Sequence, residues 1–223
     1  MSDAKPTLAI LGGSGDLGGG LAFRWARAGY PIIIGSRSAD KAREAAIALA
    51  ARVPAAEVRG LDNQGAAAAG DIVVLTVPFA NQAPTLETIR AAVQGKILID
   101  VTVPLVPPKV GTVQLPEGGS AGQIAQHLLG DGVRVVSAFQ NVAAAHLEDP
   151  EHDPDCDVLV CGNDADACRQ VLALVTAAGM TGWHAGPIAN SVVAEALTSV
   201  LITLNRRYKI PGAGFRITGT PQA

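Results

Sequence analysis

The stretch LAILGGSGDLGGGLAFRWARAG, from Leu8 to Gly29, contains seven glycines, six of them between Gly12 and Gly20. They separate a short apolar run from a segment with the composition of a helix. Glycine weakens regular elements, because its backbone loses the most conformational entropy on folding. So many glycines at one strand-to-helix turn predict that something must approach the backbone closely there.

Apolar, β-branched runs and alanine-rich helical segments alternate along the first 139 residues. We expect strands at Thr7–Leu11, Pro31–Gly35, Asp71–Val77, Gly95–Val103 and Val133–Phe139. Helices are expected from Asp16 to Ala28, over 38–53, after Asn81 and over 120–130. Continuous apolar strands that alternate with helices are typical of a parallel sheet covered on both faces. This pattern predicts an α/β protein with a doubly wound, mostly parallel sheet.

The alternation of strands and helices is interrupted twice. Thr102–Gly119 contains four prolines and is expected to be a long loop. After Asn141 come a short helical piece, the strand VLVCG and helices over about 164–178 and 188–206. We therefore expect a nucleotide-binding domain at residues 1–139 and a smaller C-terminal α/β domain at residues 140–223.

The motif Gly13-Ser14-Gly15-Asp16-Leu17-Gly18 follows a strand and opens a helix, which is the context of a G-x-G-x-x-G dinucleotide fingerprint. Here Gly13 would permit the tight turn, Gly15 would leave room for the pyrophosphate, and Gly18 would let the helix pack on the strand. The helix N-terminus would offer N–H groups to the anion. The alternative is a tight turn without a ligand. The motif favours a Rossmann-type nucleotide-binding domain.

The end of the second strand indicates which nucleotide binds. NAD enzymes place an acidic residue there for the ribose 2′-hydroxyl, whereas this chain has Ser36 and Arg37, with Lys41 a helical turn further on. A hydroxyl and two cations suit a 2′-phosphate, and the sequence thus predicts NADP rather than NAD. The alternative is a helix start capped by Ser36 or Ser38 with solvated charges.

Composition excludes some classes of protein. The net charge of −3 argues against nucleic acid as the main partner, and 48% hydrophobic residues allow a substantial core. The N-terminus lacks the pattern of a secretory signal. The apolar segment Ala189–Leu204 is short of a membrane span and contains Glu195. We expect a soluble, cytoplasmic protein.

Cysteines and acidic residues raise the question of a metal. The number of cysteines (Cys156, Cys161 and Cys168) is odd, which argues against a disulfide framework. Ordinary buried thiols are favoured over reactive or metal-binding ones. His152, Asp153, Asp155, Cys156 and Asp157 cluster, but Asp-Pro pairs and turn residues explain that stretch more simply. No metal is expected.

Catalytic marks of common NADP enzymes are missing from the sequence. Neither Tyr30 nor Tyr208 has a lysine four residues later, as a short-chain dehydrogenase would need. No sequence context marks His146 or His184 as an acid–base group. Such a chain suits hydride exchange between two cofactors, where apposition and orientation do most of the work.

From Leu8 to Ala42 the chain resembles the N-terminus of NADPH-dependent coenzyme F420 reductases, also called F420:NADP oxidoreductases. The resemblance continues through DIVVLTVPF, VVSAFQNVAAAHL, CDVLVCGND and AGPIANSVVAEALTSVLITLNRRYKIPGAGFRITG, so it covers nearly the whole chain in order. It implies a Rossmann domain with a small C-terminal domain. It also implies hydride transfer between C4 of the NADP nicotinamide and C5 of the 5-deazaflavin F420 in the cleft between them.

The resemblance also implies roles for individual residues. The positions that hold the 2′-phosphate would be Ser14, Ser36, Arg37 and Lys41. The pyrophosphate turn would be formed by Gly13, Gly15, Asp16 and Leu17. The strand end bordering the nucleotide would be Thr76, Val77 and Pro78. The segment beneath the reacting rings would contain Gln140 and Val142, where the best-known family pattern has a histidine at the position of Gln140.

Other residues near the C-terminus have two interpretations. Asn190 and Ser191 would hydrogen-bond the second cofactor or cap the last helix. The anionic tail of F420 would be guided by Arg206, Arg207, Lys209 and Arg216, which could equally be a solvated basic helix end. The long C-terminal helix suggests a homodimer. Two other functions remain open: NADPH-dependent reduction of a flavin, ferric chelate or small carbonyl compound, and NADP sensing without turnover.

Overall fold

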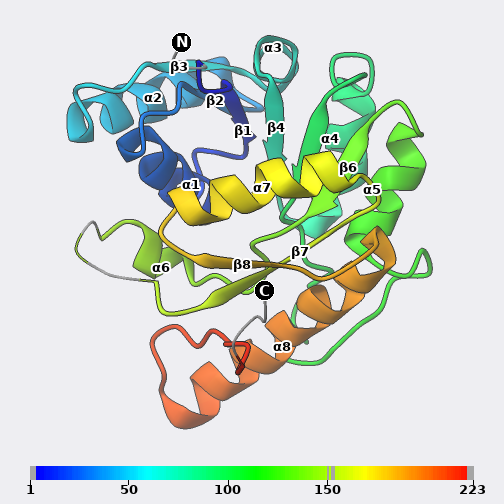
Figure 1. The fold of residues 1–223 in the computed structure, drawn as a ribbon. Helices are drawn as coiled ribbons and strands as arrows, with labels where there is room; N and C mark the ends of the chain where they lie inside the picture. The colour runs from blue at the N-terminus through cyan, green and yellow to red at the C-terminus, as the bar shows by residue number, and fades with distance from the viewer. Residues whose placement is uncertain (1–3, 150, 152–153, 220–223) are drawn as a thin grey trace.

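A computed structural model describes residues 4–149, 151 and 154–219. Within these residues eight strands form one sheet in the order β3-β2-β1-β4-β5-β6-β7-β8 (Figure 1). The strands are β1 Leu8–Leu11, β2 Ile32–Ser36, β3 Val58–Asp62, β4 Ile72–Leu75, β5 Ile97–Asp100, β6 Arg134–Ser137, β7 Asp157–Gly162 and β8 Thr181–His184. The α-helices are α1 Asp16–Arg27, α2 Ala39–Arg52, α3 Asn63–Ala69, α4 Gln82–Ile89, α5 Ala121–Leu129, α6 Ala144–Leu147, α7 Ala165–Ala177 and α8 Ser191–Tyr208.

Strands β1 to β6 are parallel and follow the doubly wound order, which confirms the predicted fold class. β1 lies between β2 and β4, with Leu8 paired to Ile32 on one side and to Ile72 on the other. In this order the chain reverses direction across the sheet between β1 and β4. The carboxyl ends of these strands therefore leave a crevice next to the glycine turn.

The sheet has an apolar core on each face, because successive side chains of a strand point to opposite sides. Leu8 and Ile10 of β1 belong to the core under α1, α2 and α7, whereas Ala9 and Leu11 belong to the core under α3, α4 and α5. The indole of Trp25 ties α1 to α7 by donating to the carbonyl of Leu174 at 2.8 Å. Both sides of the parallel strands are thus buried, as the continuous apolar runs predict.

The C-terminal part extends the same sheet. β7 pairs with β6 in the antiparallel sense, with Ser137 opposite Cys161, and β8 then runs parallel to β7. The loop at 102–119 lies on α8, because the Thr203 hydroxyl donates to the carbonyl of Gly111 at 2.8 Å. The strands and this loop join the two predicted domains, and the division at 139/140 stays a prediction.

The helix predicted over 188–206 corresponds to α8 and the short 3₁₀ turn Ile188–Asn190 before it. Residues Ile188–Tyr208 are long and apolar enough to cross a membrane by length and composition alone, whereas we expected a segment too short for that. In the structure this helix contacts α5 and β7 and buries the carboxylate of Glu195 (2% exposed). One face of the helix is thus packed against the rest of the protein, and 33% of its apolar window is buried.

Besides β8, two elements of the nucleotide-binding part, β3 and α3, escaped the sequence prediction. β3 has the sequence VRGLD, whose side chains are at most partly buried because the strand lies at the edge of the sheet. It therefore lacks the apolar run that marks the inner strands. α3 is a short run of mostly alanine that gives little periodic signal. Both elements border the nucleotide crevice.

Candidate functional site

The glycine turn brings three chain segments into contact at the carboxyl end of β1. Gly12 has a φ of +87° and supplies the left-handed residue of the turn. Gly13, the glycine predicted to permit the tight turn, follows it and donates its N–H to the carbonyl of Ile10 at 3.1 Å. A Cβ on Gly18 would lie 2.5 Å from Thr76 Oγ1 and 2.7 Å from the carbonyl oxygen of Gly12. Gly18 thus lets α1 pack on the strand ends, as predicted. Gly13 faces the sheet, where a Cβ would lie 2.8 Å from the carbonyl oxygen of Ile10.

The first turn of α1 has no side-chain cap. Its N-cap is Gly15, whereas α2, α3, α5 and α7 begin at residues whose side chains accept a backbone N–H, namely Ser38, Asp62, Ser120 and Asp164. The N–H groups at the start of a helix have no partner within it and carry a partial positive charge. Beside an exposed glycine turn, they form a place for a phosphate group.

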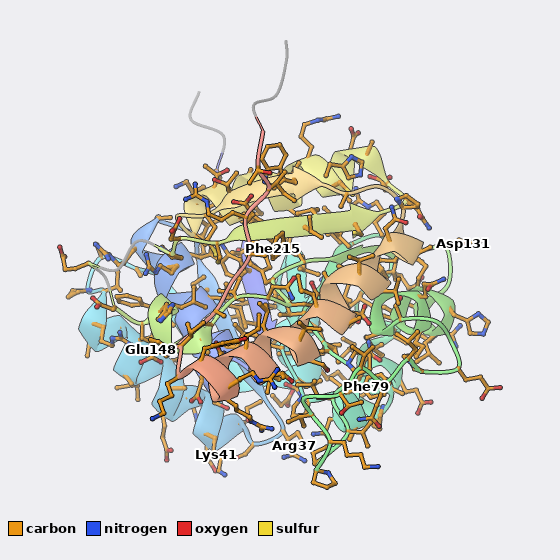
Figure 2. The ribbon with its side chains drawn as sticks, turned by 90° about the horizontal axis from the view of Figure 1, so that it is seen from below. Arg37, Lys41, Phe79, Asp131, Glu148 and Phe215 are labelled. Carbon is orange, nitrogen blue, oxygen red and sulfur yellow. The ribbon has the colours of Figure 1, made fainter. Side chains whose placement is uncertain are left out.

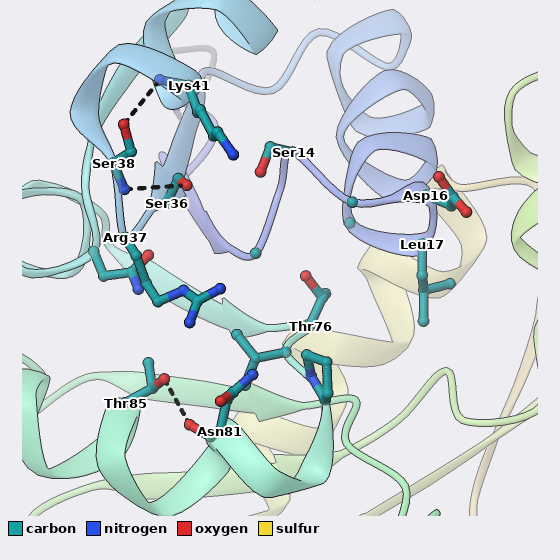
Figure 3. Close-up of a pocket in the computed structure, with 16 residues that line it drawn as sticks. Ser14, Asp16, Leu17, Ser36, Arg37, Ser38, Lys41, Thr76, Asn81 and Thr85 are labelled. Atoms are coloured by element: carbon teal, nitrogen blue, oxygen red, sulfur yellow. Dashed lines mark hydrogen bonds between the residues drawn. The ribbon is translucent and has the colours of Figure 1, made fainter. Parts of the chain in front are cut away.

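A cavity of about 520 Å³ opens in front of this turn (Figure 3). It is bordered by the turn, the end of β2, the start of α3 and the segment after β4. Its lining residues are Gly12, Ser14, Gly15, Asp16, Leu17, Gly18, Ser36, Arg37, Ser38, Lys41, Asn63, Thr76, Val77, Pro78, Asn81 and Thr85. Every residue predicted to bind the pyrophosphate or the 2′-phosphate lines it except Gly13, and so do the three predicted after β4.

Two cations point into this cavity. Figure 3 shows the side chains of Arg37 and Lys41 directed into the space bounded by Ser14 and Thr76, and Figure 2 places both cations at one edge of the molecule. Within the described part of the chain neither forms an ion pair. Their charge is therefore available to an anionic ligand.

A capped helix start and two cationic side chains lie together at the end of β2. Ser38 is the N-cap of α2 and accepts the Lys41 backbone N–H at 3.4 Å, while Ser36 Oγ accepts the Ser38 N–H at 3.4 Å. The capping alternative is thus correct for Ser38. It leaves the side chains of Arg37 and Lys41 uncommitted, and no carboxylate stands at the end of β2.

A second cavity of about 380 Å³ shares a border with the first. Its lining residues are Ser36, Arg37, Asp62, Asn63, Gln64, Asn81, Pro84, Thr85 and Thr88. Asn63, Asn81 and Thr85 line both cavities, and none of them was predicted from the sequence to bind the nucleotide. Asn63 lies directly after β3, and Asn81 and Thr85 lie at and near the start of α4. A sequence prediction that included β3 would therefore have pointed to Asn63.

The predicted acceptor-side residues Gln140 and Val142 do not line these two cavities. Gln140 is 6% exposed, and its amide donates to the carbonyl of Asp100 at 2.9 Å and to Ser137 Oγ at 2.8 Å. Its Oε1 is buried without a hydrogen-bond partner. Val142 borders a separate cavity of about 240 Å³, together with His146, Cys156 and residues of the C-terminal tail.

The other predicted second-cofactor residues also lie apart from the nucleotide cavity. Asn190 is exposed, and its amide donates to the carbonyl of Ala185 at 2.7 Å. Arg207 is exposed in the last turn of α8. Arg216 forms an ion pair with Asp155 at 2.9 Å. The structure thus brings the nucleotide residues together but does not gather these residues into one cavity.

A buried polar network that the sequence did not reveal joins the ends of β5 and β6 to α8. The carboxylate of Glu195 accepts the N–H groups of Ala121 at 2.6 Å and Gly122 at 3.1 Å, and the Ser191 hydroxyl donates to it at 2.9 Å. Asp100 is fully buried and accepts the Thr102 N–H at 2.8 Å.

Burial dominates the electrostatics of both carboxyls. It raises the pKa of Asp100 to about 6 and that of Glu195 to about 7, against the hydrogen bonds that favour their charged forms. Gln82 links them by donating to Asp100 and, at 2.9 Å, to the carbonyl of Ala121. The network therefore holds α5 and α8 against the end of the sheet.

The thiols have the character of buried structural residues. Burial raises the pKa of Cys156 and Cys161 to about 11, which is opposite to the shift that activates a cysteine. Of the predicted acidic cluster, His152 and Asp153 lie outside the described residues. Over the described ranges no group of three or more His, Cys, Asp or Glu side chains is placed to hold a metal ion.

The parallel sheet order, the uncapped glycine turn and the cationic cavity define a Rossmann-type dinucleotide-binding protein. The family model described as "NADP oxidoreductase coenzyme F420-dependent" matches residues 7–104. The F420-dependent NADP reductase of Methanocaldococcus jannaschii is 42% identical over 219 residues, which cover 95% of this chain and 97% of that protein. The chain belongs to the F420-dependent NADP reductase family.

Two further comparisons agree. The F420-dependent NADP reductase of Methanothermobacter thermautotrophicus is 40% identical over 223 residues, which cover 96% of each chain. The crystal structure of a putative F420-dependent NADP reductase from Arthrobacter sp. FB24 has a TM-score of 0.78 and 26% sequence identity, and the match covers 95% of this chain and 99% of that one. The likeness thus includes the C-terminal part, which the family model does not cover.

Proposed function

We propose that the protein is an oxidoreductase that transfers a hydride between NADP(H) and the 5-deazaflavin coenzyme F420. The observation that carries the nucleotide assignment is the cavity in front of the glycine turn, with Arg37 and Lys41 directed into it. The acceptor assignment rests on the relatives, whose full length this chain matches. NADPH supplies the hydride, and the protein supplies the binding sites and the exclusion of water.

The residues present fit an NADP molecule. The turn at Gly12 and Gly18 leaves no room for side chains, and the first turn of α1 has no side-chain cap, so its N–H groups suit a bound pyrophosphate. Arg37 and Lys41 suit the 2′-phosphate, because a guanidinium binds phosphate oxygens in pairs and an ammonium adds a second charge. Ser14, Asp16, Leu17, Thr76, Val77 and Pro78 complete the proposed nucleotide site.

We assign the acceptor side to Gln140 and Val142, with Asn190 and Arg207 as further contacts to F420. The support is the resemblance of the segments around them to the family. Gln140 is held in place by two hydrogen bonds from its amide and retains an acceptor, Oε1, without a partner. The side chain cannot change charge, so we assign it a positioning role and no proton transfer.

A steady-state assay tests the function. Purified protein is mixed under anaerobic conditions with NADPH and oxidised F420, and the deazaflavin absorbance is followed. Parallel reactions contain NADH as donor, or FMN or a ferric chelate as acceptor. We expect fast bleaching of F420 with NADPH and little reaction in the parallel samples. Fast reduction of FMN or the ferric chelate, with F420 unchanged, would overturn the acceptor assignment and keep the nucleotide assignment.

We also propose that the protein is a cytoplasmic homodimer that does not require a membrane or nucleic acid. Support for the dimer comes from the exposed apolar side chains Val193 and Val200 on α8 and Leu115 in the loop beside it, which are 58%, 43% and 63% exposed. Sedimentation equilibrium at micromolar concentration tests this proposal. A single species with the mass of one chain, 22.7 kDa, would contradict it.

A further inference from the structure

The buried carboxylate of Asp157 binds two groups from distant parts of the chain. Asp157 is the first residue of β7 and is 6% exposed. Its Oδ2 accepts the indole N–H of Trp183 on β8 at 2.7 Å and the backbone N–H of Ile217 at 2.7 Å. Among residues 4–149, 151 and 154–219 no basic side chain forms an ion pair with it. Burial of a charge destabilises a protein unless the charge is well hydrogen-bonded, so this carboxylate calls for an explanation.

Asp157 fastens the C-terminal tail (residues 209–219) to the start of β7. The backbone N–H of Asp157 donates to the carbonyl of Phe215 at 2.9 Å, so that its main chain and its side chain both hold the tail. Nearer to α8, the carboxamide oxygen of Asn205 accepts the Ala213 N–H at 2.8 Å. Figure 2 shows the tail leaving α8 and passing Phe215. The tail is thus bonded to the protein at alternate residues.

The tail forms part of the wall of the cavity of about 240 Å³ beside Val142, which Gly212 and Gly214 line. It packs closely against the other parts of this wall. A Cβ on Gly212 would lie 2.5 Å from His146 Cε1, and a Cβ on Gly214 would lie 2.5 Å from Cys156 Cβ. Release of the tail would therefore open the cavity.

We propose that Asp157 is a positioning residue for the acceptor, because it holds the tail as a wall of the cavity at Val142. This inference rests on the proposed function, in which Val142 belongs to the acceptor side. Asp157 does not line the cavity and acts through the glycines of the tail. The nucleotide cavity is bordered by other elements, so the affinity for NADPH does not depend on Asp157.

Steady-state kinetics with NADPH and oxidised F420 tests this role. Asp157→Ala should raise the KM for F420 roughly tenfold, as expected for the loss of a charge-assisted hydrogen bond. The kcat and the dissociation constant of NADPH should each stay within about twofold, because only acceptor binding is weakened. Asp157→Asn keeps an oxygen that accepts both N–H groups, so its KM should stay within about threefold of the natural value. Asp166→Asn, which removes an exposed carboxylate paired with Arg169, is the matched control and should keep the KM.

Ile217→Pro removes the same hydrogen bond from the other side, at a residue that is 44% exposed, and it decides the matter if Asp157→Ala does not fold. Hydrogen exchange of the tail without ligand, measured by mass spectrometry, shows whether the tail is released. We expect faster exchange in both variants together with the raised KM. An unchanged KM for F420 in Ile217→Pro, or a raised KM without faster exchange, would overturn the inference and leave the proposed function standing. Failure of the natural protein to reduce F420 would overturn both.

Discussion

The carboxyl ends of β1 and β2 and those of β5 and β6 lie on one edge of the same sheet, but their surroundings differ. At the first pair, Arg37 and Lys41 point into an open cavity without an ion pair among the described residues. At the second pair, Asp100 and Gln140 are buried and hydrogen-bonded within the protein. One region keeps its polar groups for a ligand, and the other uses them to hold α5 and α8 in place.

Because of this difference, we expect nucleotide affinity and stability to depend on different residues. Substitutions in the cavity should weaken NADPH binding and leave the free energy of unfolding nearly unchanged. Substitutions in the buried network should lower the free energy of unfolding and leave the nucleotide affinity of the folded protein nearly unchanged.

The largest expected effect is that of pH on the free energy of unfolding, through the two carboxyls of the buried network. Burial raises the pKa of Asp100 to about 6 and of Glu195 to about 7, whereas the unfolded chain has ordinary values of 3.8 and 4.5. As pH rises through this window, the unfolded chain loses protons that the folded protein still holds. Stability therefore falls, by about 1 kcal/mol per pH unit for each group, and levels off above about pH 7.

Urea unfolding without nucleotide between pH 4.5 and 8 measures this dependence. The stability that the two carboxyls contribute is fully present below the pKa values they have in the unfolded chain. It is lost above the pKa values they have in the folded protein. Glu195→Gln should flatten the part of the curve between pH 6 and 7. The opposite result would be a free energy of unfolding that falls more steeply with pH in Glu195→Gln than in the natural protein. It would mean that the Glu195 carboxyl stabilises the fold more as pH rises, which contradicts a raised pKa.

Removing the Glu195 carboxylate is expected to have the next largest effect. Glu195→Ala leaves the buried N–H groups of Ala121 and Gly122 without their acceptor, at a cost of about 3 kcal/mol in the free energy of unfolding. The dissociation constant for NADPH should stay within about twofold at a temperature where the variant is folded. A tenfold loss of NADPH affinity with unchanged stability would reverse the roles of the two regions.

Arg37→Ala should have a smaller effect, and it should change the affinity for NADPH rather than the free energy of unfolding. Loss of a charge-assisted contact to the 2′-phosphate should weaken NADPH binding by roughly thirtyfold, or about 2 kcal/mol. NADH binding should change little, because NADH has no 2′-phosphate, and the melting temperature should stay the same. Calorimetric titration with both nucleotides measures the effect, and equal losses for the two would remove Arg37 from the 2′-phosphate site.

Ser38 gives the smallest and sharpest test, because it lines the cavity but serves the fold as the cap of α2. Ser38→Ala should lower the free energy of unfolding by about 1 kcal/mol. Its effect on NADPH affinity should be less than that of Arg37→Ala. A large loss of affinity without destabilisation would show that Ser38 belongs with the ligand-binding residues.

The sequence could predict the nucleotide region because its signals are local. The glycine turn and the Ser36–Lys41 segment each lie within a few residues, and their strand-to-helix context is visible in the apolar pattern. The buried network has no such signal, since Glu195 meets Ala121 across 74 positions of the chain. Asn63 was missed because the polar edge strand β3 before it lacks an apolar run.

The central claim is direct hydride transfer from NADPH to F420, and isotope transfer tests it most directly. NADPH deuterated at each of the two C4 positions in turn is mixed with oxidised F420 and the enzyme, and the reduced deazaflavin is analysed by mass spectrometry. We expect one of the two labelled donors to deliver its deuterium to C5 of F420. Reduced F420 without deuterium from either donor, or no reduction at all, would contradict it.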